Sequence, residues 1–182
     1  MEQEEIDLIM QIQNWNLDLF TKLYNNYFHK IYTFVLMKVD WNIQLAEDVT
    51  ATTFMKAFEN INKFSFDKKW SSFKAWIYNI AYHCLLDTIK RNNEKYFSDE
   101  NDVIYDSGYV DYFQKHIQVE QILSYLEQLW SEKKDLFILR IWNNLSYDEI
   151  SKILWKRSST LRKDFSKLIK KTTNHFKYWL CE

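Results

Sequence analysis

Glycine and proline are almost missing from this 182-residue chain, which has one Gly and no Pro. Tight turns between β-strands usually need Gly, so the composition favours helices joined by polar turns over a sheet protein. A Gly-rich phosphate-binding loop is excluded too, because a single Gly cannot build one. The two cysteines, Cys84 and Cys181, are too few for a disulfide framework or a metal-ligand cluster.

Long apolar runs are also missing. No segment approaches about 18 uninterrupted apolar residues, so we predict no membrane insertion. The acidic N-terminus, MEQEEIDLIMQI, lacks the basic start of a signal peptide. The four His residues (29, 83, 116 and 175) are scattered, and no nucleophile–base arrangement is visible. We therefore expect a cytoplasmic protein that is not an enzyme and binds no cofactor or metal.

What the chain does contain is apolar periodicity at helical spacing. Hydrophobic residues make up 47% of the chain and aromatic residues 18%, enough to form a packed core. Steps of three and four residues predict three amphipathic helices. Their buried stripes run from Leu19 to Val35, from Leu45 to Ile61 including Phe58, and from Phe73 to Ile89. Lys90 and Arg91 suit the C-terminal end of the third helix. Cys84 falls within that stripe as a small core residue.

The periodicity fades over residues 92–115, which are polar and acidic and include the single Gly, Gly108. Helical spacing returns from Ile117 to Leu129 and again around Lys134–Trp142. We therefore predict an all-α fold with two small helical domains, residues 1–91 and 116–182. A flexible linker over residues 92–115 would join them.

Charge is unevenly spread along the chain. Residues 1–91 hold 10 basic and 11 acidic side chains, net -1, and residues 92–130 hold 2 and 8, net -6. Residues 131–182 hold 12 and 6, net +6, so the three parts sum to the overall net charge of -1. This asymmetry favours a nucleic-acid-facing C-terminal end after an acidic middle.

The C-terminal part reads as a helix-turn-helix with a basic second helix. Ser146 and Glu149 have the spacing of a capping box, and Ser158 or Ser159 is expected to cap the second helix. The core stripe of that helix is Leu161, Phe165, Leu168, Thr172 and Phe176, which leaves its Lys and Arg residues on the other sides. The pattern alone leaves two readings equally open: a DNA-reading helix, or a lysine-rich surface helix of a bundle.

Three stretches, in order, resemble the bacterial sigma-70 family of transcription initiation factors, in its extracytoplasmic-function (ECF) group. Ala46-Glu47-Asp48 with Thr53-Phe54 looks like the first conserved block. Phe73-Lys74-Ala75-Trp76-Ile77-Tyr78 with Asp87 is similar to the block that ends the first domain. Leu145-Ser146-Tyr147-Asp148-Glu149-Ile150 resembles the signature of the promoter-reading block. The resemblance implies a protein that binds core RNA polymerase and promoter DNA and helps to open the duplex.

The resemblance also implies roles for individual residues in the first domain. The residues that it implies for polymerase binding are Asp48, Ala51, Thr52, Phe54 and Met55. Ala51 and Thr52 stand where the family usually has Gln and an acid, which predicts weaker polymerase binding. The residues that it implies for binding an unstacked minus-ten base are Phe66, Lys68, Lys69, Trp70, Asn79 and His83. It implies phosphate contacts for Lys90 and Arg91. His83 stands where the family often has Asn. Trp76 and Tyr78 are expected to pack in the core.

In the second domain, the minus-thirty-five contacts implied by the resemblance are Arg157, Ser158, Ser159, Thr160, Arg162, Lys163 and Lys167. Asp164 replaces a residue that is commonly Arg, which predicts altered sequence preference and weaker DNA binding. Trp155 stands where the turn usually has Gly. Because a positive φ strains a Trp, a tighter or longer turn is expected there.

Further expectations concern partners. The acidic linker would, by resemblance, lie in basic channels of the polymerase, and an anti-sigma factor is a common partner in the family. Two other functions stay open from the residues. One is a helix-turn-helix regulator that binds DNA without polymerase, and the other is a degenerate sigma-like protein that sequesters a partner and forms no active holoenzyme.

Overall fold

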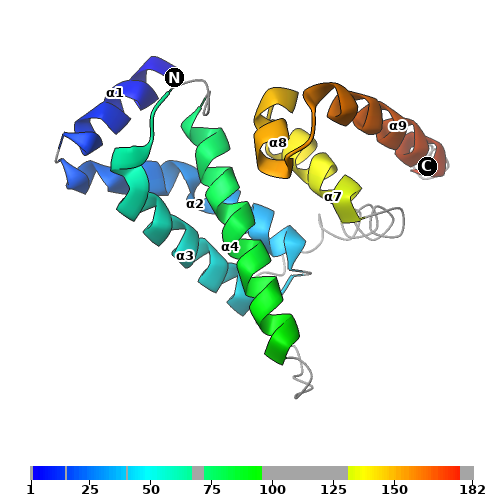
Figure 1. Ribbon diagram of the computed structural model, residues 1–182, viewed down its shortest axis with the longest axis horizontal. Coiled ribbons are helices and arrows are strands. Elements are labelled where there is room, and N and C mark those ends of the chain that lie inside the picture. Colours follow the sequence, from blue (N-terminus) through cyan, green and yellow to red (C-terminus); the bar gives the residue numbers. More distant parts are fainter. Residues whose placement is uncertain (1, 15, 40, 67–71, 96–130, 177–182) are drawn as a thin grey trace. The chain divides into compact units, whose positions relative to one another are not determined.

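The structure, a computed structural model, describes residues 2–14, 16–39, 41–66, 72–95 and 131–176 (Figure 1). The chain divides into two compact units, Met1–Glu100 and Asn101–Glu182. Every regular element that the described residues form is a helix, which confirms the all-α prediction. None of the helices in these ranges is both long and apolar enough to cross a membrane.

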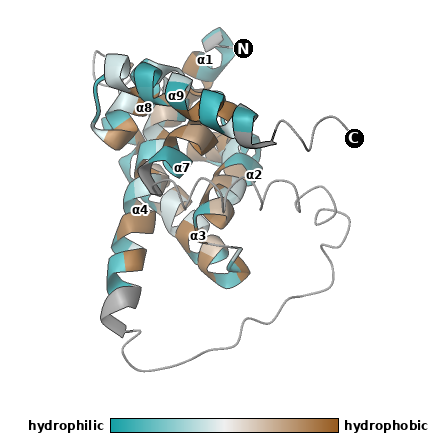
Figure 2. Ribbon diagram, turned by 90° about the vertical axis from the view of Figure 1, so that its right-hand side faces the viewer, coloured by the Kyte–Doolittle hydropathy of each residue, from teal (hydrophilic) through white to brown (hydrophobic). Residues whose placement is uncertain are grey.

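The first unit is built around three long helices that contact one another, α2, α3 and α4. Its elements are α1 (Glu2–Gln13), η1 (Leu17–Leu19), α2 (Phe20–Lys38), α3 (Ile43–Asn60), η2 (Ile61–Lys63) and α4 (Phe73–Lys95). Small side chains let the helices approach closely, since Ala57 and Ala81 are fully buried and Cys84 is buried as predicted. Figure 2 shows the apolar residues of these helices in brown.

Aromatic rings fill the space between the three helices. The ring of Phe34 on α2 lies edge-on to that of Tyr78 on α4, with the two centroids 5.3 Å apart. Tyr27 and Phe73 form a second edge-on pair across the same two helices, at 5.4 Å. Such pairs add about 0.5–1.5 kcal/mol each beyond area burial. Trp76 and Tyr78 are buried, so their predicted core packing is confirmed.

Helix α1 was not among the predicted helices, yet it is an integral part of the first unit. Ile9 and Ile12 are fully buried, and Tyr27 donates a hydrogen bond from its hydroxyl to Glu5 Oε1 at 2.6 Å. Gln13, its last residue, donates from Nε2 to the carbonyl oxygens of Ile61 at 2.8 Å and Phe64 at 2.7 Å. The end of α1 thereby holds the segment that leaves α3.

Two details of the first unit differ from the sequence predictions. Helix α4 continues to Lys95, four residues beyond Arg91, because the segment Asn92–Lys95 contains no Gly or Pro to end it. Phe58, expected on the buried side of α3, is 41% exposed, although its ring lies edge-on to Phe20 at 5.1 Å. The remainder of the predicted linker, residues 96–115, and the predicted helix from Ile117 to Leu129 lie outside the described residues.

The second unit contains α7 (Ser131–Phe137), the π-helical turn η4 (Ile138–Trp142), α8 (Tyr147–Leu154) and α9 (Ser158–Phe176). In η4 the Asn143 N–H donates to the Ile138 carbonyl, five residues back, at 3.1 Å. Leu139, Leu145, Ile150, Ile153, Leu161 and Leu168 are buried and form the core beneath α8 and α9. These two helices form the predicted helix-turn-helix.

Candidate nucleic-acid interface

The first helix of the helix-turn-helix begins at the predicted capping box. Ser146 Oγ accepts the Glu149 N–H at 3.2 Å, and Glu149 Oε2 accepts the Ser146 N–H at 2.8 Å. Each side chain thus satisfies a backbone donor that the helix itself leaves unpaired. The capping-box prediction is confirmed, and it fixes where α8 starts relative to the turn that follows.

The turn between α8 and α9 is not the tighter or longer variant that we expected. Trp155 itself adopts the left-handed conformation, with φ 51° and ψ 37°, and closes α8 as a Gly normally would. Its side chain is 64% exposed. The turn therefore uses a left-handed residue at the end of α8, and the strain is carried by the backbone of one exposed Trp.

The start of α9 also differs from the prediction of a Ser cap. Ser158 is the first helical residue, and the Leu161 N–H donates to the Arg157 carbonyl at 3.0 Å. The Ser158 hydroxyl instead donates to Asp148 Oδ1 at 2.5 Å, which ties the first turn of α9 to α8. Arg157 therefore stands at the capping position, and Ser158 has a contact within the helix pair.

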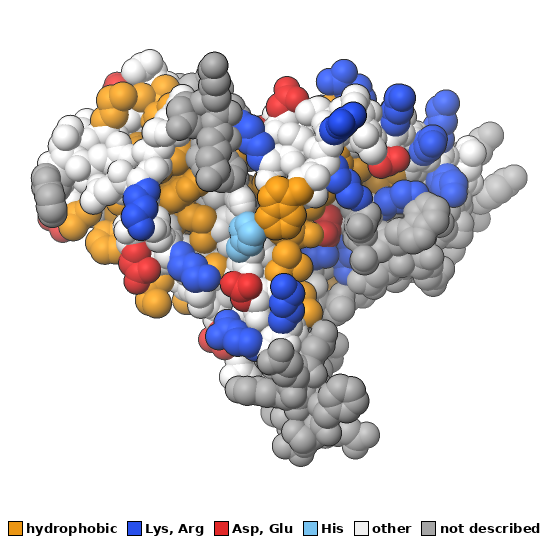
Figure 3. All heavy atoms as spheres, viewed as in Figure 1, with side chains coloured by type: hydrophobic (Ala, Val, Ile, Leu, Met, Phe, Trp, Pro, Cys, Tyr) orange, Lys and Arg blue, Asp and Glu red, His pale blue; other side chains and the backbone are white. Residues whose placement is uncertain are grey.

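Helix α9 presents an exposed basic surface. Its sequence holds five Lys or Arg residues and one Asp, a net charge of +4. Leu161, Leu168 and Thr172 of the predicted stripe are buried, and Phe165 is half-buried. Of the predicted minus-thirty-five contacts, Ser158 is half-buried and the exposed ones are Arg157, Ser159, Thr160, Arg162, Lys163 and Lys167. Hydrophilic residues predominate along α9 in Figure 2, and Figure 3 shows Lys and Arg side chains gathered there.

The lysines of this surface repel one another where α9 packs against α7. Partial burial lowers the pKa of Lys133, and the positive charges of Lys171 and Lys167 lower it further. Asp164 acts in the opposite direction. A bound phosphate would relieve this repulsion, since an anion favours the charged form of each lysine. The surface is therefore suited to a polyanion such as DNA.

The ring of Tyr147, at the start of α8, contacts two arginines. The guanidinium carbon of Arg140 is 4.8 Å from the centroid of the Tyr147 ring, and that of Arg162 is 5.3 Å from it. The ring of Phe165 on α9 meets Tyr147 at 6.0 Å with an interplanar angle of 68°. Arg162, a predicted DNA contact, is thus held against α8.

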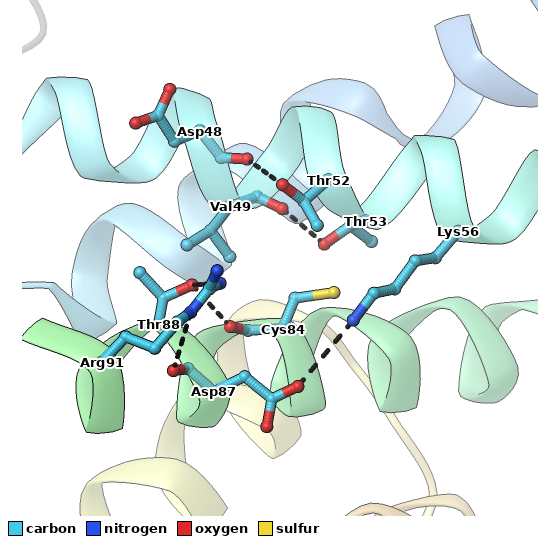
Figure 4. Close-up of polar contacts among 9 residues, drawn as sticks. All are labelled: Asp48, Val49, Thr52, Thr53, Lys56, Cys84, Asp87, Thr88 and Arg91. Atoms are coloured by element: carbon cyan, nitrogen blue, oxygen red, sulfur yellow. Dashed lines mark hydrogen bonds and ion pairs between the residues drawn. The ribbon is translucent and has the colours of Figure 1, made fainter.

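In the first unit, the predicted polymerase contacts divide between two sides of α3. Asp48, Ala51 and Met55 are exposed, and Met55 is 63% exposed. The Thr52 hydroxyl donates to the Asp48 carbonyl at 2.8 Å, while the Asp48 carboxylate points away from α4 (Figure 4). Phe54 is buried instead, with its ring 4.7 Å from that of Tyr24.

The exposed side of α3 carries an apolar stripe that the sequence reasoning recognised only in part. Ala51, Met55 and Phe58 follow one another at steps of four and three residues, and all three are exposed. We name this set the α3 stripe. Phe58 was missed because an aromatic at core spacing usually points inward. The signal that could have found it is the shared spacing with Ala51 and Met55.

The predicted minus-ten contacts lie on α4 and just before it. Phe66 is 36% exposed, and its ring lies 4.7 Å from the buried Phe64. Asn79 is buried, and its Oδ1 has no hydrogen-bond partner among the described residues, whereas His83, one turn later, is exposed. A buried acceptor left unpaired is costly in a folded protein. Lys68, Lys69 and Trp70 lie outside the described residues.

The far part of α4 supplies the predicted phosphate contacts and a link to α3. Lys90 and Arg91 are exposed, and Arg91 donates from Nη2 to Thr88 Oγ1 at 3.4 Å. Lys56 on α3 forms an ion pair with Asp87 at 3.8 Å (Figure 4). Within the residues that the structure describes, no group of three or more His, Cys, Asp or Glu lies together to hold a metal ion.

The families and proteins that this chain is similar to are sigma factors. The family described as Sigma-70 region 2 matches residues 23–95, which span α2 to α4. The RNA polymerase sigma factor YlaC of Bacillus subtilis is 27% identical over 147 residues, 78% of this chain and 83% of YlaC. The ECF RNA polymerase sigma factor SigW of the same organism is 30% identical over 91 residues, 50% of this chain and 46% of SigW.

The fold, too, is similar to a solved structure. CnrH, solved in complex with the cytosolic domain of CnrY, matches 94% of this chain and 96% of its own, with a TM-score of 0.66. The sequence identity is 15%, so this likeness concerns the fold alone.

Proposed function

The chain belongs to the ECF group of the sigma-70 family, and we infer that it binds core RNA polymerase and directs transcription initiation at specific promoters. The observation that carries this function is the pairing of two features in one chain. The first unit has the exposed α3 stripe, and the second has a capped helix-turn-helix with an exposed basic α9.

We propose that the two units have different binding roles. Residues 1–91 would bind core polymerase and the minus-ten element, residues 92–115 would be a linker, and residues 116–182 would bind the minus-thirty-five element. The match of Sigma-70 region 2 to residues 23–95 supports the first assignment. The chain would act in the cytoplasm, where it meets polymerase and DNA, and its role would be binding rather than catalysis.

The proposed polymerase surface is the exposed side of α3: Asp48, Ala51, Thr52, Met55 and, in addition, Phe58. Its apolar character compensates for the missing Gln and acid at positions 51 and 52, because burial of Met55 and Phe58 replaces polar contacts with hydrophobic ones. Phe54 contributes indirectly, since its buried ring holds α3 against Tyr24 of α2.

The proposed promoter surfaces are α9 and the start of α4. Ser159, Thr160, Lys163 and Lys167 face solvent and would enter the major groove, while Arg157 and Arg162 lie beside α8 or the turn. Phe66, Asn79 and His83 would receive an unstacked minus-ten base, with Lys90 and Arg91 on the phosphates. Asp164 is half-buried beside Lys133, so its charge is partly neutralised within the unit.

We also propose that a second protein holds this chain inactive, as an anti-sigma factor does. The support is the likeness to CnrH, which was solved in complex with the cytosolic domain of CnrY. Such a partner would compete with polymerase if it covers the α3 stripe.

Holoenzyme assembly tests the proposed function and its polymerase surface. The full chain should co-elute with core RNA polymerase, and Met55→Glu should weaken the complex tenfold or more. Burying a Met is worth about 1.5–3 kcal/mol, and about 1.4 kcal/mol is a tenfold change in affinity. Met10→Glu is the matched control, because Met10 is 51% exposed and belongs to α1, not to α3. Failure of the unaltered chain to bind core polymerase would favour the polymerase-independent DNA regulator.

A further inference from the structure

Tyr147 has a set of contacts that the promoter-reading signature does not explain. It is the first residue of α8, and its half-buried ring lies beside Arg140, Arg162 and Phe165. Two of these partners, Arg162 and Phe165, belong to α9. A side chain at the start of one helix of the pair therefore determines where an exposed cation of the other helix rests.

Contacts other than the one with Arg162 already hold the Tyr147 ring in place. The capping box of Ser146 and Glu149 fixes the backbone on either side of it. Arg140 donates from Nη1 to the Leu145 carbonyl at 2.7 Å, so its guanidinium is anchored while it lies over the ring. Arg162 is instead exposed, and its guanidinium retains donors that can reach a ligand.

Contacts from two adjacent residues of α8 also fix the rotation of α9. Asp148 accepts a hydrogen bond from Ser158, and Tyr147 contacts Arg162 and Phe165. Positions 158, 162 and 165 are four and three residues apart, so they share the side of α9 that faces α8. Ser159, Lys163 and Lys167 form the neighbouring exposed row.

The location of the Arg162 guanidinium decides which part of DNA it can meet. When a helix-turn-helix docks, the second helix enters the major groove and the first helix crosses the phosphate backbone. Arg162 is folded toward the first helix, so its donors lie where the phosphates pass. An arginine stacked on a ring has also lost much of its rotamer freedom before binding, which lowers the entropic cost of gripping an anion.

We propose that Tyr147 is a positioning residue that holds Arg162 as a fixed phosphate clamp, which leaves base reading to the Ser159, Lys163 and Lys167 row. This inference rests on the proposed DNA-binding function of α9. It predicts that Arg162 contributes to affinity for every DNA sequence alike, and that the aromatic ring of Tyr147, rather than its hydroxyl, is what the clamp requires.

The test is a double-mutant cycle on the full chain with a fluorescein-labelled 25-base-pair duplex of mixed sequence and a second, scrambled duplex. Arg162→Ala should raise Kd about fivefold on both duplexes and make the salt slope shallower by about 0.9. Tyr147→Leu should have a similar effect, and the double variant should be little weaker than either single one. Tyr147→Phe should bind within about twofold of the unaltered chain, because the ring is retained.

A readout that needs no DNA tests the ring contact itself. The Arg162 Nε–H resonance should be shifted by the ring current in the unaltered chain and in Tyr147→Phe, and this shift should be lost in Tyr147→Leu. Additive effects of the two substitutions on Kd, or an effect of Tyr147→Phe as large as that of Tyr147→Leu, would overturn the clamp. If the unaltered chain binds DNA in a salt-dependent way but the effects of Arg162→Ala and Tyr147→Leu are not coupled, only the clamp is refuted. If the unaltered chain shows no salt-dependent binding to DNA, the proposed DNA-binding function is refuted as well.

Discussion

Trp155 combines a left-handed backbone with a bulky side chain that is 64% exposed. A non-Gly residue held in this region costs about 1–3 kcal/mol, and solvent around the ring limits what its packing can return. Helix ends of this kind are usually closed by Gly for that reason. A strained aromatic next to Lys156 and Arg157 therefore lowers the stability of the turn that leads into α9.

Replacing this residue should stabilise the protein. Trp155→Gly should raise the free energy of unfolding by about 1 kcal/mol, since relief of strain outweighs the entropic cost of Gly. Trp155→Ala is the control, because it removes the ring and keeps the Cβ that causes the strain. Urea unfolding of the full chain measures both. Equal stability of the Gly and Ala variants would show that the left-handed backbone is not strained.

At the scale of single residues, sequence reasoning succeeded where a local rule was strong. The Ser146–Glu149 capping box forms as its spacing predicts. Ser158 is not the cap because it is already the first residue of the helix, and its hydroxyl donates to Asp148, ten residues earlier, a contact that no local pattern predicts. Phe58 fails because its periodicity is that of a core residue, while the neighbouring helices leave its position open to solvent.

Among the elements, α1 makes the largest unanticipated contribution. Its last residue, Gln13, supplies both side-chain hydrogens to carbonyl groups, at Ile61 and Phe64. Phe66, a proposed minus-ten contact, follows only two residues later. The element therefore supports the segment that leads toward the proposed base-capture site, although α1 itself contains none of the proposed contacts.

Removing the amide should loosen that segment. Gln13→Leu should lower the free energy of unfolding by about 1–3 kcal/mol, because the part-buried Phe64 carbonyl loses its donor and the Ile61 carbonyl keeps only the Phe64 N–H. Amide hydrogen exchange near Phe64 and Phe66 should become faster. Gln11→Leu is the matched control, since Gln11 is exposed on the same helix. If the two variants are equally stable and exchange alike, α1 does not hold this segment.

Apolar periodicity predicted the helices that have long apolar stripes, and it missed α1 and the π-helical turn η4, which have none. The helices α2, α3, α4, α8 and α9 follow stripes spaced at three and four residues. The stripe of α1 is short and lies among acidic residues, and α1 contacts η1 and η2. The hydrogen bond of the π-helical turn η4 spans one residue more than that of an α-helix, and no sequence pattern predicts this.

On the scale of the whole molecule, charge is unevenly distributed along the chain. The part from residue 131 onward has a net charge of +6, and residues 92–130 have a net charge of -6. The positive charge lies mainly on α9, where it is exposed, and the apolar α3 stripe belongs to the other unit. A protein that binds DNA with one unit and a large protein with the other requires this separation, because one surface cannot suit both partners.

Run-off transcription with core RNA polymerase and genomic DNA tests the central claim most directly. With the chain added, transcripts should start at discrete sites that share sequence elements about 10 and 35 base pairs upstream, since the two units would each bind one element. Addition of Met55→Glu should reduce these transcripts, whereas Met10→Glu should not. No transcript above that of core polymerase alone, from a chain that still binds DNA, would contradict the account.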